Sequence, residues 1–506
     1  MLLKKKIMNK VTIDPAKSIL AFYAGQSIFL TGATGFLGKV FIEKVLRSCP
    51  DVREIFLLIR PAKGLDVNQR FEKMLNLPLF DKLREERPSS FKKLIPISGN
   101  VSDKVLGLSD ENKQMLIDRV TIIIHGAASV KFNDSLKYAI LNNTRSTRDI
   151  CILAQNMKNV VALVYVSTAF TNVNKPFVEE KVYSPIVNWK KMIDMAESLD
   201  EHTLNVFMAK FLDYAPNTYI FSKNLAESII QEYSFSLPCA IVRPSIVMSS
   251  IREPFPGWID NYYGPISLYI GGGKGAIRVA YLNTSCHSNF VPVDIVVKAM
   301  LVVCWKLGLT TFTKDSNLFV LNCVIERRTT HRYDIDVFRS MLDEIPLDGT
   351  IWNNKSIYTT NFILFYILTM LLHVMPATLI DRILMCFGRR PMAIRLVRLL
   401  YVVSCVTYYF SSNNWEYSNI NKSFLTSLIP PEEQKMFSFD YSAYDMKEYF
   451  KNFMIGGKKF LLYEDLNRLD AARVRQKRVH LLSTVTENII FLGVLWVIYK
   501  WIYIYL

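Results

Sequence analysis

Two pairs of residues, about 50 positions apart, carry side chains that could move a proton. Tyr219 and Lys223 stand four residues apart in NTYIFSKNLAE, so on a helix both project from one face. A nearby ammonium favours the phenolate, so we expect Lys223 to lower the pKa of Tyr219 toward neutral pH. Upstream, Ser167 and Thr168 end the apolar run VYVST, where a hydroxyl can hydrogen-bond an oxygen on which charge builds.

A glycine-rich segment makes these residues more informative than Tyr and Lys at this spacing alone. TGATGFLG, residues 31–38, follows an apolar run and precedes an amphipathic helical pattern, KVFIEKVLR. Gly32 permits a tight turn, Gly35 lets the backbone approach a pyrophosphate, and Gly38 lets helix and strand pack closely. The helix N-terminus would face the phosphate charge. This context predicts a dinucleotide site with contacts from Thr31, Gly32, Thr34, Gly35, Phe36, Leu37 and Gly38.

The residues after the second apolar run indicate which dinucleotide binds. An NAD site places an acidic side chain there to bond the ribose 2′-hydroxyl. Here the run ends LLIRPAK, with Arg60 and Lys63 and no acid. Because these cations suit a 2′-phosphate, we predict NADPH as the cofactor, although solvated loop cations are the alternative.

The elements that would position these groups belong to an α/β fold. Short apolar runs near 27, 54, 93, 120, 160 and 239 alternate with helical patterns. Such alternation predicts βαβ units and a Rossmann-type, doubly wound parallel sheet covered by helices on both faces. We expect a mainly helical C-terminal domain to follow it, and a hydrophobic membrane segment to end the chain.

Composition narrows the class of protein. The 506 residues are 50% hydrophobic and 21% charged, which excludes a disordered or fibrous chain. A net charge of +16 suits an anionic partner, yet no nucleic-acid-binding motif is apparent. The eight cysteines include no C-x-x-C pair, so we expect a reducing compartment and no metal site.

The C-terminus has the character of a membrane anchor. Residues 489–506 carry one charge, Lys500, and tryptophan and tyrosine residues typical of bilayer interfaces; a buried amphipathic helix is the alternative. The basic residues that precede this segment indicate that the rest of the chain stays in the cytosol. At the other end, the polar residues that follow Lys4–Lys6 exclude a secretory signal.

A second apolar stretch, residues 362–380, contains His373 and Pro376. A full crossing of the bilayer, a hairpin, an in-plane helix and a hydrophobic core helix all remain open for it.

The chain resembles the extended short-chain dehydrogenase/reductases and, within them, the eukaryotic fatty acyl-CoA reductases, including many from insects. The similar segments within residues 25–300 include the glycine loop, IIIHGAASVKF, VYVSTAF, NTYIFSKNLAE, IVRPSIV, PGWIDNYYGP and FVPVDIVVKA. Later segments, WEYSNINKSFLTSL, FSFDYSAYDMKEYF and GGKKFLLYED, resemble the family's C-terminal domain. The resemblance thus spans nearly the whole chain.

The resemblance implies NADPH-dependent reduction of a long-chain fatty acyl-CoA to a primary alcohol with release of CoA, through a bound aldehyde. By motif, Thr168, Tyr219 and Lys223 take the catalytic positions, and Thr168 is preferred to Ser167 because it directly precedes an alanine. Tyr219 and Lys223 also contact the cofactor, and no metal is implied. The departures from the family pattern are Asn100, where an aspartate usually lies beside the adenine, Ser288 and Asn289 before VPVD, and Met446 where tryptophan is common.

Several side chains have two interpretations each. His125 either contacts the cofactor or substrate or has a structural role. Lys131 either reaches the CoA phosphates or is a solvated loop residue. Arg243 positions either the backbone or the cofactor. GGGKG, residues 271–275, is a substrate loop or a surface turn. Aromatic clusters near 262–269 and 401–410 line an acyl tunnel or pack in the core.

We expect the following division of the chain: an N-terminal arm (1–25), a catalytic domain (26–355) with its substrate-binding part from about 236, a hydrophobic segment (356–380), a reductase C-terminal domain (381–466), a basic linker (467–488) and the anchor (489–506). The expected location is an endoplasmic reticulum or peroxisomal membrane, with the catalytic domain in the cytosol; a homo-oligomer is left open. The alternatives are a steroid or sugar-nucleotide dehydrogenase and an inactive NADPH-binding scaffold.

Overall fold

The computed structural model describes residues 18–62, 64–185, 187–309, 318–326, 328–441 and 444–505. The chain forms two compact units, each assembled from separate stretches of sequence. The first, which we call the sheet unit, comprises Met1–Phe255, Asn289–Glu326 and Trp415–Ser442. The second, the helical unit, comprises Pro256–Ser288, Arg327–Asn414 and Ala443–Leu506.

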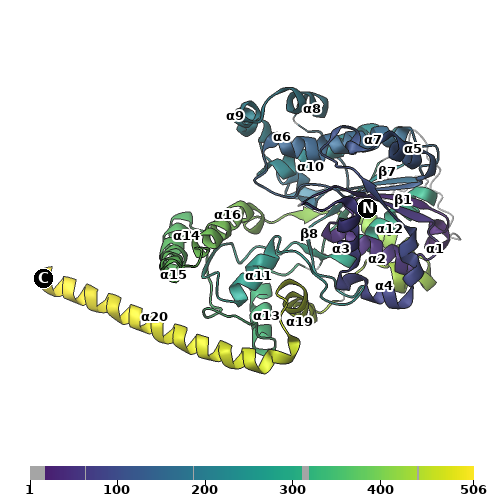
Figure 1. The fold of residues 1–506 in the computed structure, drawn as a ribbon. Coiled ribbons are helices and arrows are strands. Elements are labelled where there is room, and N and C mark those ends of the chain that lie inside the picture. Colours follow the sequence, from purple (N-terminus) through teal and green to yellow (C-terminus); the bar gives the residue numbers. More distant parts are fainter. Residues whose placement is uncertain are drawn as a thin grey trace, which may run out of the picture. The chain divides into compact units, whose positions relative to one another are not determined.

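A parallel sheet of seven strands, in the order β11-β7-β5-β4-β1-β2-β3, forms the centre of the sheet unit (Figure 1). The strands are β1 (Ser27–Thr31), β2 (Glu54–Ile59), β3 (Leu94–Ser98), β4 (Ile122–His125), β5 (Ala162–Val166), β7 (Cys239–Pro244) and β11 (Phe319–Cys323). Most are buried along their whole length, as continuous apolar runs in a doubly covered parallel sheet should be. The predicted fold class and all six predicted strands are confirmed; β11 was not predicted.

Helices cover both faces of this sheet (Figure 1). One face carries α5 (Asp110–Arg119), α7 (Ser146–Gln155) and α10 (Thr218–Tyr233), and the other carries α1 (Ile19–Tyr23), α2 (Phe36–Ser48), α4 (Asp81–Glu86) and α12 (Val293–Leu309). The remaining helices of the unit are α3 (Val67–Leu75), α6 (Leu136–Ala139), α8 (Trp189–Ser198), α9 (Glu201–Leu212), α17 (Ile420–Leu428) and α18 (Gln434–Phe437). Short strand pairs complete it: β6 (Phe177–Val178) with β13 (Glu416–Tyr417), and β8 (Ile246–Met248) with β10 (Phe290–Pro292).

The helical unit contains one two-stranded pair, β9 (Val279–Tyr281) with β12 (Ile357–Thr359), within its described residues. Its helices are α11 (Pro265–Gly273), α13 (His331–Glu344), α14 (Phe362–Thr369), α15 (Met375–Cys386), α16 (Ala393–Ser411), α19 (Met446–Gly456) and α20 (Leu469–Tyr505). Residues 271–273 of the GGGKG segment end α11, so this segment is in part a helix end.

The apolar stretch at 362–380 is one helix that runs on to Cys386, despite His373 and Pro376. A turn of π-helix, Met370–Val374, joins α14 to α15 just before Pro376. Proline removes one backbone hydrogen bond from a helix, and a wide π turn next to it lets the helix continue.

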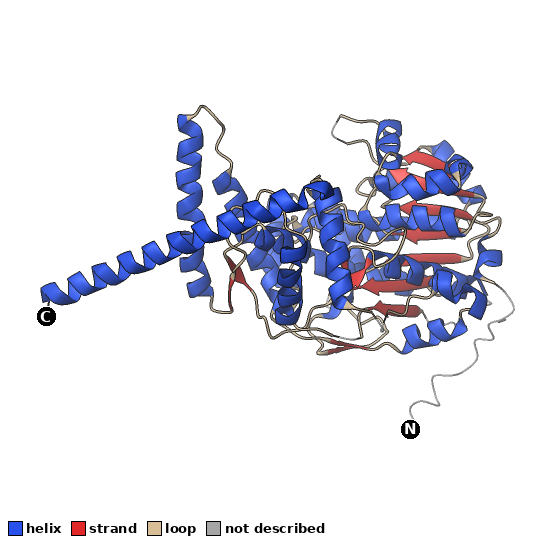
Figure 2. Ribbon diagram, turned by 90° about the horizontal axis from the view of Figure 1, so that it is seen from below, coloured by secondary structure: helices blue, strands red, loops and turns tan. Residues whose placement is uncertain are grey.

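The basic segment expected to be a linker is helical and continuous with the C-terminal apolar segment in α20, which Figure 2 shows as one long helix. Within the described part of the chain, three helices are long and apolar enough to cross a bilayer: Phe362–Cys386, Ala393–Ser411 and Leu466–Tyr503. These three helices indicate association with a membrane. The second helix contains the aromatic cluster near 401–410 and was not predicted as a membrane segment.

Candidate active site

The carboxyl ends of β1, β4 and β5 meet at one edge of the sheet. These strands are adjacent and parallel, with Thr31 paired to His125 and His125 to Tyr165. The connection that follows β1 and the one that follows β4 leave the sheet toward opposite faces. A doubly wound sheet binds its ligand at such a switch point. The glycine loop follows β1, and the Ser167–Thr168 pair follows β5. Residues predicted from separate motifs therefore share this edge.

Close contacts explain two glycines of the loop. Gly32 has φ +79°, and a Cβ atom there would lie 2.9 Å from the backbone nitrogen of Ala127, in the loop after β4. A Cβ atom on Gly38 would lie 2.3 Å from the carbonyl oxygen of Gly32. Any side chain at either position would push the loop away from α2 or from β4.

The start of α2 has the properties of a phosphate site. Gly35 is the N-cap residue, is exposed, and provides no side chain to accept a hydrogen bond from the first turn. Phe36 and Leu37, in that first turn, are half-buried, so N–H groups without an intrahelical partner lie at the loop surface. A pyrophosphate fits such a site, because backbone N–H groups and the helix dipole both favour anions there.

Two arginines lie together at the end of β2. Arg60 is exposed directly after the strand, and Arg70, from α3, donates hydrogen bonds to the Arg60 carbonyl oxygen and, at 3.3 Å, to Thr34 in the glycine loop. Burial and the charge of Arg60 both lower the pKa of Arg70. Two neighbouring guanidinium groups have the charge and the hydrogen-bond donors that suit an anion. Lys63 lies outside the described residues.

Arg70 was missed by the sequence analysis. It lies ten residues beyond Arg60, and only the return of α3 toward the end of β2 brings the two together. Spacing alone contains no signal for that return.

Asn100 lies in the turn after β3. Its amide nitrogen donates to Ser102 at 2.6 Å and to Asp103 at 3.1 Å, and its amide oxygen accepts from the Ser102 backbone at 3.3 Å. These bonds shape the turn itself. The predicted contact with an adenine stays a prediction.

Tyr219 and Lys223 lie on the first two turns of α10, which Asn217 caps by accepting a hydrogen bond from Ile220 N at 3.0 Å. Tyr219 is half-buried and lies near the side chain of Thr168, after β5. The Lys223 ammonium donates to the Val166 carbonyl at 2.6 Å and lies 4.6 Å from the Tyr165 ring centroid. The structure therefore brings together Thr168, Tyr219 and Lys223, the three residues predicted to be catalytic.

The expected effect of Lys223 on the Tyr219 pKa was wrong. Burial raises the pKa of Tyr219 to about 12, and the nearby Thr168 hydroxyl offsets only part of this rise. Burial also lowers the pKa of Lys223 to about 7, against the charge of Glu227, so its ammonium is only partly populated near neutral pH. In this environment desolvation outweighs charge–charge attraction, and Tyr219 is a protonated hydrogen-bond donor at neutral pH.

Ser167 and Thr168 have different partners. Ser167 Oγ donates to Glu227 at 2.5 Å, and Glu227 forms a fully buried ion pair with Arg243 at 2.6 Å. Arg243 also donates to the carbonyl oxygens of Glu179 and Lys181 at 3.1 and 2.8 Å. Arg243 therefore holds backbone and α10 in position, and Thr168 remains the hydroxyl that meets Tyr219.

His125 has both ring nitrogens engaged. Nδ1 lies 2.8 Å from the Thr31 hydroxyl and Nε2 lies 3.2 Å from the Thr147 hydroxyl. The side chain is fully buried, and burial, with the charge of Lys223, lowers its pKa to about 3. Of the two interpretations of His125, the structure supports the structural one: a neutral imidazole that connects β1 and β4 to α7.

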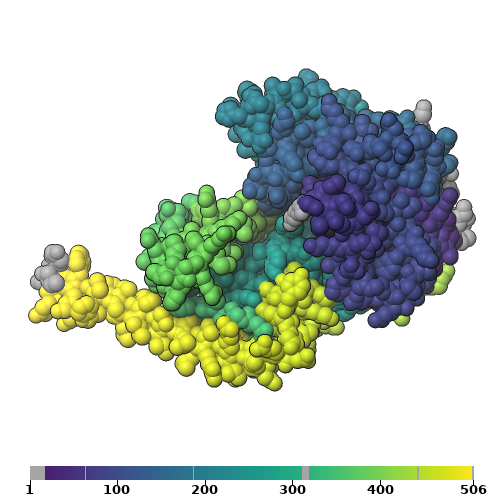
Figure 3. All heavy atoms as spheres, in the orientation of Figure 1, coloured from purple at the N-terminus to yellow at the C-terminus, as the bar shows by residue number. Residues whose placement is uncertain are grey.

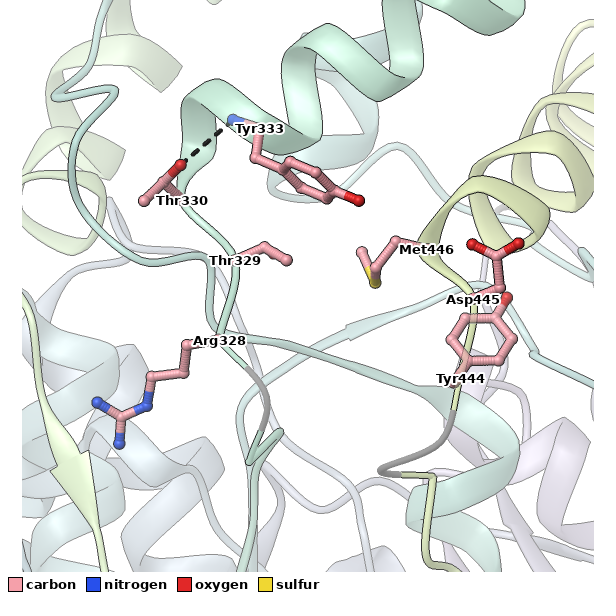
Figure 4. Close-up of a pocket in the computed structure, with 7 residues that line it drawn as sticks. All are labelled: Arg328, Thr329, Thr330, Tyr333, Tyr444, Asp445 and Met446. Carbon is pink, nitrogen blue, oxygen red and sulfur yellow. Dashed lines mark hydrogen bonds between the residues drawn. The ribbon is translucent and has the colours of Figure 1, made fainter.

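A cavity of about 500 Å³ lies within the helical unit, between the N-termini of α13 and α19 (Figure 4). Thr330 caps α13 by accepting from Tyr333 N at 3.3 Å, and Asp445 caps α19 by accepting from Lys447 N at 2.9 Å. Met446, a departure from the family pattern, also lines the cavity. The cavity contains none of the residues predicted to be catalytic.

Known proteins match this chain over most of its length. A family model described as male sterility protein matches residues 30–300, and a second with the same description matches residues 372–464. Fatty acyl-CoA reductase 1 of Xenopus laevis is 38% identical over 90% of this chain and 88% of its own length. Fatty acyl-CoA reductase wat of Drosophila melanogaster is 34% identical over 96% of this chain and 93% of its own. The chain belongs to the fatty acyl-CoA reductase family.

Solved structures support the fold of this reductase. The terminal R domain of the myxalamid PKS-NRPS pathway superposes with a TM-score of 0.54 at 18% identity, covering 87% of this chain and 93% of that domain. The reductase domain of a non-ribosomal peptide synthetase from Mycobacterium tuberculosis gives 0.53 at 15% identity, covering 88% and 96%. At these identities the likeness concerns the fold alone. Family and fold together give the reductase a nicotinamide cofactor.

Proposed function

We propose that this reductase converts a long-chain fatty acyl-CoA to the primary alcohol with NADPH, through a bound aldehyde, and releases CoA. The observation that carries the proposal is that Thr168, Tyr219 and Lys223 lie together at the carboxyl ends of the strands, in a chain that matches fatty acyl-CoA reductases over 90% of its length. Two hydroxyls that converge at the carboxyl edge of the sheet suit an oxygen that gains negative charge.

The residues around the glycine loop fit NADPH. The first turn of α2 and the loop Gly32–Gly38 would hold the pyrophosphate. Arg60 and Arg70 would hold the 2′-phosphate, because a phosphate accepts paired hydrogen bonds from guanidinium groups. Lys63 is proposed for the same role from its position in the sequence. When bound, NADPH supplies the hydride that each of the two reductions needs.

Tyr219 and Thr168 act on the substrate oxygen. Their hydroxyls donate hydrogen bonds to the oxyanion that forms at the thioester carbonyl, and its collapse breaks the C–S bond and expels the CoA thiolate. In the second reduction Tyr219 gives its proton to the alkoxide, which yields the alcohol. A phenol with a raised pKa holds its proton until that moment. Lys223 assists by holding the nicotinamide ribose.

The apolar helices and the net charge support a proposal for the location. We propose attachment to an endoplasmic reticulum or peroxisomal membrane, with the sheet unit in the cytosol. A membrane suits an alcohol product of low water solubility. The +16 net charge suits capture of a polyanionic acyl-CoA.

The test is to incubate membranes that contain the full chain with NADPH and acyl-CoAs of several lengths. We expect release of CoA thiol together with formation of fatty alcohol. Tyr219→Phe should reduce both by about 100-fold or more, since a general acid contributes roughly 10²–10⁴-fold, and should keep NADPH binding.

Alcohol oxidation without thiol release would identify another type of dehydrogenase. NADPH binding with no turnover of any acyl-CoA would identify a scaffold. Equal turnover in wild type and Tyr219→Phe would exclude Tyr219 as the proton donor.

A further inference from the structure

The helix Phe362–Cys386 and helix α16 form an antiparallel hairpin joined by residues 387–392; we call it the hairpin. Figure 3 shows its atoms, in green, on the surface of the molecule. Its polarity is the reverse of a helix in a water-soluble protein, which buries its apolar stripe and exposes its polar face.

The buried stripe of the first helix contains polar residues. Thr369, His373 and Asp381 are at most 7% exposed and lie on one face with Phe365 and Ala377, at intervals of four residues. His373 Nε2 accepts a hydrogen bond from the backbone of Arg278 at 2.8 Å. The Asp381 carboxylate accepts from three backbone N–H groups that begin α16, those of Met392, Ala393 and Ile394, at 2.8–2.9 Å. His373 and Asp381 are therefore satisfied inside the protein, whereas the buried Thr369 hydroxyl has no hydrogen-bond partner among the described residues.

The outward face is apolar. Ile363, Met375 and Leu379 are each more than 60% exposed, and Phe387 at the turn is 78% exposed. Further apolar side chains extend this surface on both helices: Leu371, Ile380, Ile383, Leu396, Leu399 and Val402. A continuous apolar surface of this extent marks a contact with another apolar phase.

The end of the hairpin is basic. Five exposed arginines lie at or near the turn: Arg382, Arg389, Arg390, Arg395 and Arg398. Asp381 is the single acidic residue between 362 and 411, and its carboxylate is already engaged. The hairpin therefore presents a net positive charge next to its apolar surface.

We propose that the hairpin lies in the plane of a lipid surface with anionic headgroups, its apolar face among the acyl chains and its arginines on headgroup phosphates. A helix with an apolar face and cations at its border is the type that binds at bilayer interfaces. A full crossing would place these five arginines at the far surface of the bilayer, which opposes the positive-inside rule. The proposal does not depend on the reaction catalysed.

Cys386, next to the turn, provides a native probe. Of the eight cysteines, all within the described residues, only Cys386 is exposed; Cys405 is half-buried and is replaced by alanine. The full chain, labelled on Cys386 with an environment-sensitive NBD fluorophore, is reconstituted into vesicles of phosphatidylcholine alone or with 30% phosphatidylserine. Spin labels at shallow or deep positions of the lipid report the depth of the fluorophore.

We expect the NBD emission to shift to the blue and to be quenched more by the shallow than by the deep spin label. Both effects should be greater in vesicles that contain phosphatidylserine. Each arginine near an anionic surface contributes roughly fivefold to binding, so Arg389→Gln with Arg390→Gln should lower the inserted-to-free ratio by about 25-fold. The matched control, Arg87→Gln with Lys92→Gln, removes the same charge from exposed positions of the sheet unit and should change nothing.

NBD emission that is the same in both kinds of vesicle, and unchanged by Arg389→Gln with Arg390→Gln, would overturn the role of the headgroups. Quenching by an aqueous reagent trapped inside the vesicles, but not by the same reagent outside, would show a full crossing and overturn the in-plane arrangement. A fluorophore exposed to the outer solution in every vesicle would overturn lipid contact altogether.

Discussion

Ser167 and Thr168 are neighbours in the chain, yet their hydroxyls lie in different environments. Ser167 donates to the buried Glu227, and Thr168 meets Tyr219. Alternation of side chains along extended backbone places adjacent residues on opposite sides, so one hydroxyl serves the protein interior and the other the site.

This difference predicts different effects on turnover. Thr168→Ala should lower turnover by about 100- to 1000-fold, the usual effect of losing one donor to an oxyanion, and should lower the free energy of unfolding by about 1 kcal/mol, since its hydroxyl also accepts a hydrogen bond from Phe170 N. Ser167→Ala should keep turnover within a few-fold and lower the free energy of unfolding by about 1 kcal/mol, since a buried hydrogen bond is lost. Thiol release and thermal unfolding of the purified variants measure the two effects. Loss of turnover in Ser167→Ala but not in Thr168→Ala would identify Ser167, and not Thr168, as the catalytic hydroxyl.

Arg70 gives a second prediction at this scale. If Arg60 and Arg70 hold a 2′-phosphate, alanine at either position should raise KM for NADPH by about 10- to 100-fold, which is the loss of one charge-assisted hydrogen bond. KM for NADH, which lacks this phosphate, should hardly change. Arg84→Ala, an exposed arginine paired with Asp81 on α4, is the matched control. An equal rise in KM for NADPH and NADH would show that the arginines do not contact the 2′-phosphate.

At the scale of elements, the ion pair of Glu227 and Arg243 joins α10 to β7. Both side chains are fully buried, and the pair makes two hydrogen bonds, at 2.6 and 2.8 Å. Removing one partner leaves the other charge buried and uncompensated, which typically costs 3–5 kcal/mol. The position of Tyr219 and Lys223 depends on this connection, since both lie on α10.

Arg243→Met should therefore lower the free energy of unfolding by about 3–5 kcal/mol, measured by urea denaturation in detergent. The double variant Arg243→Met, Glu227→Leu removes both charges and should recover much of that loss. A double variant that is less stable than the single one would contradict this account of the pair.

Local patterns predicted most of the sheet, because each strand is a short apolar run between turn residues and each pairs in parallel with its neighbours. The motifs also predicted that Thr168, Tyr219 and Lys223 meet, because parallel strands end at one edge. The position of Arg70 and the rise in the Tyr219 pKa depend on packing between segments distant in sequence. Burial is a property of the assembled fold, so residue spacing cannot reveal it.

At the scale of the whole molecule, the chain carries two kinds of apolar helix. The hairpin buries polar groups against the protein, whereas α20 is exposed along nearly all of residues 481–503. An interfacial helix binds a membrane reversibly, and a spanning helix does not. The two attachments should therefore differ in how they are released.

Deletion of residues 489–506 tests this difference. The full chain should leave membranes only with detergent, whereas the shortened chain should be released by alkaline carbonate and still bind phosphatidylserine vesicles through the hairpin. Flotation on density gradients measures both. Resistance of the shortened chain to carbonate would mean that another of the three apolar helices crosses the bilayer.

The sheet unit is not contiguous in the chain: Trp415–Ser442 returns to it after the hairpin. Within that return, Asn421 donates to the Val320 carbonyl of β11 at 2.7 Å, and Trp415 donates to the Val173 carbonyl at 3.0 Å. After residue 326, a ribosome needs roughly 5 to 20 s to synthesise the rest of this unit, because both hairpin helices come first. During synthesis the apolar hairpin therefore leaves the ribosome before the sheet unit can complete its fold. Chains truncated between residues 326 and 442 should accordingly be degraded and should show no activity.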